Sequence, residues 1–207
     1  MSAQREDLLL KMYEVLNNEI SRHITVIWQS ISVVIGAFTL LSLVEKNIFN
    51  VDMAIGIIIL LIIWLFEHLI DSGYWYNRNL VMIANIERQF LTESDQKDIH
   101  YYFGSHRAGN KMLTHLKIQS RLGVGLAIIV IFYHFYTRVY AGLSLPLTWE
   151  NFEPMRTLPY LVVLYAFYHI PKQSRAADKK YQEFIQNSPG KTINTTSVNY
   201  GPGHPIK

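Results

Sequence analysis

The residues of this chain that could carry out chemistry gather in a polar stretch between its hydrophobic segments. The stretch supplies carboxylate and imidazole groups, which metal-dependent hydrolases use: Asp95, Asp98, His100, His106 and His115. A hydrolase zinc site places two histidines four residues apart on a helix with a glutamate between them, and no pair here has that arrangement. Surface histidines are the simpler interpretation, and we expect no catalytic residue, no metal site and no cofactor.

Other catalytic patterns are missing from the sequence as well. The chain has no cysteine, which excludes thiolate metal sites, cysteine nucleophiles and disulfides. It also lacks a glycine-rich phosphate loop and a G-x-S-x-G nucleophile turn. The net charge is only +3, and acidic residues interrupt the basic ones, which argues against direct nucleic-acid binding. The sequence therefore predicts a protein that is not an enzyme.

The composition indicates a membrane protein. Half of the 207 residues are hydrophobic and 17% are charged, against about 25% charged in ordinary soluble domains. Three long runs, 24–44, 51–70 and 122–139, are almost free of charge. The first of them would form a helix of ~31 Å, which matches the hydrocarbon core of a bilayer.

A fourth apolar run, residues 158–170, is short for a membrane span. Its crossing is favoured by the distribution of charge. With four crossings, residues 1–22, 71–121 and 172–207 share one side of the membrane and hold 16 of the 19 Lys and Arg residues. By the positive-inside rule that side is the cytoplasm. We therefore expect both termini in the cytoplasm.

The predicted fold class is an all-α membrane protein with four transmembrane helices and long cytoplasmic helical extensions. Residues 1–44 form an amphipathic helix continuous with the first span, because apolar residues keep helical spacing up to it. The remaining segments are the second span with its extension, a connector, the third span, the short fourth span, and a cytoplasmic helix with a flexible tail: 51–91, 92–120, 121–141, 157–171 and 172–207.

Polar and small residues recur along the first span at steps of four and three. Such spacing places them on one face of a helix: Thr25, Gln29, Ser32, Gly36 and Thr39. This stripe of residues 25–39 predicts either a helix–helix interface or the wall of a water-lined pore. A similar stripe in the third span runs from Gly123 through Ala127, Val130 and His134 to Arg138, so the two faces could meet each other or symmetry copies.

Ionisable residues at membrane depth are functional candidates. Glu67, His68 and Asp71 lie at the inner end of the second span, and His134 lies deeper in the third. The alternative for the first three is contact with headgroup water or pairing with Arg78 or Arg121. One basic cluster follows the fourth span and predicts contact with anionic lipid or with a partner: Lys172, Arg175, Lys179 and Lys180.

Two short motifs follow the second span, Trp75-Tyr76-Asn77-Arg78-Asn79-Leu80 and Asn85-Ile86-Glu87-Arg88. With the flanking spans, over residues 5–140, they resemble the RipA-type octameric membrane proteins of bacteria. More loosely, the region resembles two-span effector domains encoded beside nucleotide-signalling and retron-type anti-phage genes. Those domains lack the fourth run and its basic tail; four-span subunits of two-gene systems such as Kiwa fit the topology better.

The resemblance implies a homo-oligomer in the bacterial inner membrane that acts in phage defence. Two functions remain open: an effector that permeabilises the membrane when its cytoplasmic part is engaged, and a non-conducting scaffold that docks a soluble cytosolic protein. We also predict a cytoplasmic subunit interface in which Glu87 pairs with an arginine of another helix; the alternative is an exposed polar face. Its residues are Trp75, Asn77, Arg78, Asn79, Asn85, Glu87 and Arg88.

Overall fold

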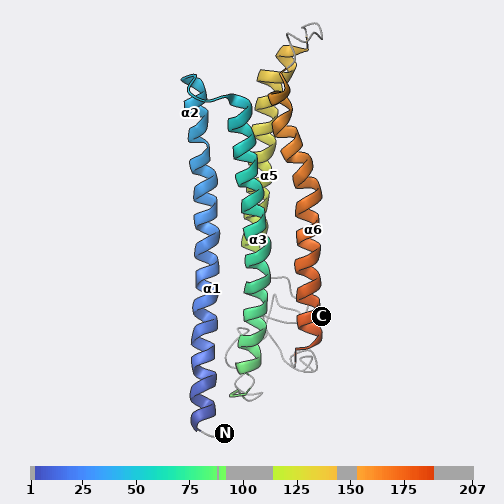
Figure 1. Cartoon of the computed structure of the whole chain (residues 1–207). Coiled ribbons are helices and arrows are strands. Elements are labelled where there is room, and N and C mark those ends of the chain that lie inside the picture. The colour runs from blue at the N-terminus through green and yellow to red at the C-terminus, as the bar shows by residue number, and fades with distance from the viewer. Residues whose placement is uncertain (1–2, 88, 92–113, 144–152, 189–207) are drawn as a thin grey trace, which may run out of the picture. The chain divides into compact units, whose positions relative to one another are not determined.

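The computed structural model describes residues 3–87, 89–91, 114–143 and 153–188, and in these ranges the chain is helical without a strand (Figure 1). The all-α fold class is thereby confirmed. Several sequence predictions lie outside the described residues. They concern most of the 92–120 connector, the tail after residue 188, Arg88, and four candidates for chemistry: Asp95, Asp98, His100 and His106.

Four long helices dominate the described chain. They are α1 (Ala3–Ala37), α3 (Val51–Glu87), α5 (Thr114–His134) and α6 (Leu158–Gln186). Short elements join or extend them: α2 (Thr39–Glu45), the π-helical turn η1 (Phe135–Val139), and the 3-10 turns η2 (Tyr140–Gly142) and η4 (Pro154–Thr157). The α6 helix continues through Pro171, where the predicted fourth span ends.

Three of these helical stretches are long and apolar enough to cross a membrane. They are Ala3–Glu45, Val51–Glu87 and Leu116–Val139, and they contain the three long apolar runs of the sequence. The α6 helix does not reach the same hydropathy in the described chain. Length and composition therefore support a membrane protein with three candidate spans.

Side chains and backbone turns explain where the first helices stop and start. A break at Phe38 separates α1 from α2, and the Thr39 hydroxyl donates to the Gly36 carbonyl there at 2.7 Å. The α2 helix ends with Asn47 in the left-handed region, at φ 53°, the position that glycine or asparagine favours after a helix. Asn50 then caps α3, because its side-chain oxygen accepts bonds from the backbone N–H groups of Asp52 and Met53.

The chain divides into two compact units. The first contains residues 1–25, 72–113 and 176–207, and the second contains residues 26–71 and 114–175. Helices α1, α3 and α6 contribute residues to both units, whereas the α5 helix belongs to the second.

In the first unit, α3 packs against α1 and against α6. Leu16 of α1 and two buried isoleucines of α3, Ile83 and Ile86, form one apolar cluster. Val81 of α3 forms another with Tyr181 and Ile185 of α6. Burial raises the pKa of the Tyr181 phenol to about 12. Both contacts follow from apolar residues at helical spacing.

In the second unit, α3 supplies most of the buried residues, including Ile55, Ile58 and Leu65. The α5 helix runs antiparallel to it. A Cβ on Gly123 would stand 3.2 Å from the Phe66 ring, and His134, eleven residues later in sequence, reaches back to Asp52. A side chain at position 123 would therefore be tight against the Phe66 ring. The α5 stripe predicted from sequence therefore faces α3.

Candidate functional site

The carboxylate of Asp52 is one of the most deeply buried polar groups of the second unit. Only 1% of its side chain is exposed. It accepts three hydrogen bonds: from His134 Nε2 to Oδ1 at 2.9 Å, from Arg138 Nε to Oδ1 at 3.0 Å, and from Arg138 Nη2 to Oδ2 at 3.1 Å. The two-pronged guanidinium contact is the strong form of such a pair, since charge and geometry both match.

His134 connects this carboxylate to α6. Its side chain has no exposed surface, and its Nδ1 lies 3.0 Å from the Tyr160 hydroxyl oxygen. A carboxylate can only accept, so Nε2–H donates to Asp52; in the neutral imidazole, Nδ1 then accepts from the Tyr160 hydroxyl. These hydrogen bonds connect a carboxylate, an imidazole and a phenol in series and so join α3, α5 and α6. Every polar side-chain atom of the three residues has a hydrogen-bond partner.

Arg138 extends the network toward the segment before α6. It also donates to Glu153, and Arg156 holds the same carboxylate with two bonds of 2.9 and 2.7 Å. Hydrogen bonds from Arg156, with the nearby Arg138 charge, keep the pKa of Glu153 below its usual range. Two carboxylates and two guanidinium groups give this part of the network no net charge, from the buried Asp52 to the exposed Glu153.

Local structure places these side chains on one side of α5. The π-helical turn η1 follows His134 directly, and its wider i→i+5 bonding brings Arg138 next to His134. Arg156 lies over Gly142: a Cβ there would stand 2.6 Å from its Nη1. On α3, the Asn50 cap fixes the first turn, which carries Asp52.

We name this set the Asp52 network: Asp52, His134, Arg138, Glu153, Arg156 and Tyr160. Although it contains an acid, an imidazole and a hydroxyl, its imidazole has no surface that a substrate could contact. The bidentate arginine already occupies the carboxylate. The arrangement therefore links helices of the second unit at one end of α3. Within the described ranges, no three His, Asp or Glu side chains are grouped so that they could hold a metal ion.

In contrast to the buried side chains of Asp52 and His134, the α1 stripe lies on the surface of the subunit. All five of its residues, Thr25, Gln29, Ser32, Gly36 and Thr39, are exposed in the subunit. The Thr25 and Ser32 hydroxyls bond the carbonyls of Ser21 and Trp28 within the helix, at 3.0 Å each. A Cβ built on Gly36 meets no atom within 4 Å. The buried residues of α1, among them Ile27, Ile31 and Val34, occupy its other side.

Among the ionisable residues at the inner end of the second span, Glu67 bonds a partner that the sequence did not suggest. Glu67 Oε1 lies 2.7 Å from His169 Nε2 of α6, so its partner is neither Arg78 nor Arg121. His68 makes an edge-to-face contact with Trp64 on its own helix, and Asp71 is exposed. Glu67 and His68 thus contact different side chains, and a functional role of the three residues stays a prediction.

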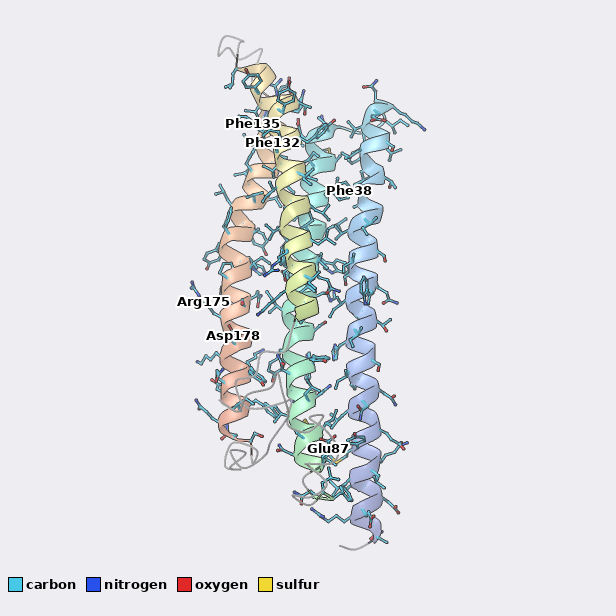
Figure 2. The ribbon with its side chains drawn as sticks, turned by 180° about the vertical axis from the view of Figure 1, so that it is seen from behind. Phe38, Glu87, Phe132, Phe135, Arg175 and Asp178 are labelled. Atoms are coloured by element: carbon cyan, nitrogen blue, oxygen red, sulfur yellow. The ribbon has the colours of Figure 1, made fainter. Side chains whose placement is uncertain are left out.

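The motif residues after the second span make contacts within the first unit. Asn77, Asn79 and Glu87 are buried, and the Tyr13 hydroxyl of α1 donates to Glu87 at 3.1 Å near the end of α3 (Figure 2). Asn85 donates to Ser188 at 3.0 Å. The pairing of Glu87 with an arginine of another helix at a subunit interface stays a prediction.

The remaining motif residues are aromatic and cationic. The Arg78 guanidinium lies 5.0 Å from the Trp75 ring and 5.7 Å from the Phe184 ring of α6, within cation–π range. Trp75 also stacks on His23. These contacts attach α1 and α6 to α3 inside the first unit.

Sequence reasoning placed His134 among the candidates but missed its partners Asp52 and Tyr160, and also Glu153 and Arg156 at the other end of the network. A signal was present: Asp52 and Arg138 stand near the ends of two predicted spans that cross in opposite directions. Opposite charges at one depth on neighbouring helices are expected to pair.

Comparison with family models, with curated proteins and with solved structures finds no match to this chain.

Proposed function

We propose that this chain is a homo-oligomeric effector of the bacterial inner membrane, in which the α1 stripe faces copies of itself. One observation carries the proposal. Within the second unit, polar side chains of the Asp52 network are bonded inside the subunit, whereas the stripe points outward from a helix apolar enough to cross a bilayer. An unpaired amide such as that of Gln29 is costly against lipid, so a second subunit or water must cover it.

The same proposal includes a fourth crossing by α6 and cytoplasmic termini. The register of α6 on α3 supports it: a Cβ on Gly56 would lie 3.3 Å from Leu158, and Glu67 bonds His169. Residues 158–169 therefore run parallel to residues 56–67 of a candidate span. The basic residues outside the spans favour the cytoplasm for both termini.

A role in anti-phage defence rests on the resemblance of the 75–80 and 85–88 motifs. In this role the stripe would line a path for ions once a cytosolic protein engages the first unit.

A non-conducting scaffold is the second candidate function, and an exposed apolar edge of α1 favours it. Leu8, Met12 and Val15 are spaced as on one helix edge and are exposed, so they offer a soluble partner a surface to bind.

Cysteine cross-linking tests the subunit contact cleanly, because the natural chain has no cysteine. In membranes treated with a mild oxidant, Ser32→Cys should give a disulfide-linked dimer on a non-reducing gel. Val33→Cys is the matched control: it is adjacent and also exposed, but its side chain points about 100° away around the helix. Equal dimer yields from the two variants, or no dimer from Ser32→Cys, would contradict a stripe-centred interface.

A further inference from the structure

The outer line of α6 changes from apolar to basic along a single helical face. Residues spaced three or four apart lie on one side of a helix, and α6 has such a series in Leu161, Leu164, Tyr168, Lys172 and Arg175. All five are exposed. The first three are large and apolar, with 64% of Leu164 and 68% of Tyr168 exposed, and the last two carry positive charge.

The two cations are available for a ligand. Lys172 and Arg175 form no ion pair within the described part of the chain, and the Lys172 ammonium lies 5.6 Å from the Tyr168 ring. The Arg175 side chain extends outward from α6 (Figure 2). By contrast, the next cation on this line, Lys179, stands 3.8 Å from Glu183 of its own helix, so its charge is partly compensated.

We propose that this line of α6 binds one anionic phospholipid. The phosphate group contacts Lys172 and Arg175, whose i,i+3 spacing lets both donate to the same oxygen cluster. The acyl chains lie along Leu161, Leu164 and Tyr168, because only a ligand with an apolar body continuous with its phosphate fills both halves of the line. The aromatic ring at the junction suits the membrane interface.

This inference rests on the proposed crossing of α6, which places the apolar half of the line in the hydrocarbon and the basic half among headgroups. It does not depend on self-association. The lipid is held by one subunit, so the site can be tested at the monomer mass whatever the outcome of Ser32→Cys cross-linking.

Native mass spectrometry in a neutral detergent measures the site directly. Phosphatidylglycerol and phosphatidylcholine with identical acyl chains are titrated separately onto the full chain, and the lipid-bound fraction is read at each concentration. We expect phosphatidylglycerol to bind more tightly. Lys172→Gln with Arg175→Gln should weaken it about 25-fold, because each surface cation contributes about 1 kcal/mol, or a factor of about five.

Arg121→Gln is the matched control. Arg121 is an exposed cation of α5. It lies two residues before Gly123, which packs on Phe66. Arg121 therefore lies near the level of the Glu67–His169 contact along α3. Its replacement should change phosphatidylglycerol binding less than twofold. Equal binding of the two lipids, or an equal loss in Arg121→Gln and in the double variant, would overturn the proposal. Helical content by circular dichroism should be the same in all variants.

Discussion

Polar residues of the apolar helices occur in two regions with opposite surroundings. The Asp52 network lies between helices, and its groups bond one another over separations of 82 and 86 residues in sequence. The α1 stripe lies on an outer face, where the Thr25 and Ser32 hydroxyls bond carbonyls of their own helix and a Cβ on Gly36 would meet no atom of the described chain within 4 Å. We infer that the subunit needs the Asp52 network for its own fold, whereas the α1 stripe needs a second surface to cover it.

The network should be the more sensitive region when stability is measured. Asp52→Ala leaves the buried His134 and the Arg138 guanidinium without their carboxylate, and removal of one member of a buried pair typically costs about 3–5 kcal/mol. We expect a large fall in the apparent Tm of the detergent-solubilised protein.

Glu14→Ala provides the control for that measurement, since Glu14 pairs with Lys11 at 3.4 Å on an exposed surface. Exposed pairs of this kind contribute about 0–1 kcal/mol. If Asp52→Ala melted at the temperature of Glu14→Ala, the network would not hold the helices together, and the contrast between the two regions would be lost.

The stripe should be sensitive in assembly instead. A Cβ on Gly36 meets no described atom within 4 Å, so we expect the Gly36→Leu monomer to fold with an unchanged Tm, while four extra carbons prevent close approach of a second helix. We expect native mass measurement to show smaller species.

Gly125→Leu on α5 is the matched substitution, because a Cβ on Gly125 also meets no atom within 4 Å. It should leave the assembly mass unchanged. Loss of assembly in both variants would mean that the effect is general to the membrane surface, and an intact assembly in Gly36→Leu would remove the stripe from the interface.

The smallest structural effect is expected from Gln29→Leu, which removes the amide at similar side-chain length. It should keep both Tm and assembly mass, yet abolish ion leakage from proteoliposomes if the stripe lines water. Val33→Leu, an apolar exchange on a neighbouring face, should leak like the natural protein. Undiminished leakage in Gln29→Leu would favour a packed interface and the scaffold function.

Helix positions followed from sequence because they depend on local pattern. The runs 24–44, 51–70 and 122–139 fall on α1 with α2, on α3 and on α5 with η1. The spacing from Thr25 to Thr39 defines a single face in any α-helix, and the structure has that face exposed. The break at Phe38 was not predicted, since Gly36 and Thr39 weaken a helix only slightly on their own.

The side chains that pair with each polar residue could not be predicted from the sequence in the same way. For Glu67, His68 and Asp71 the sequence offered headgroup water, Arg78 or Arg121 as the alternative to a functional site, and the structure gives Glu67 His169 as its partner. Residues three or four apart on one helix are neighbours by geometry, whereas Glu67 and His169 are 102 residues apart. Their meeting depends on α6 running parallel to α3 in a fixed register.

The sequence by itself determined the helices, the apolar spans and the periodic face of α1, because helical repeat and hydropathy act over a few neighbouring residues. Only the tertiary structure decided that His134 faces Asp52 while the α1 stripe faces outward. Both sets are polar residues in apolar helices and look alike in sequence. What separates them is the rotation and pairing of whole helices, which the buried apolar residues of α3 fix collectively as they pack against its neighbours.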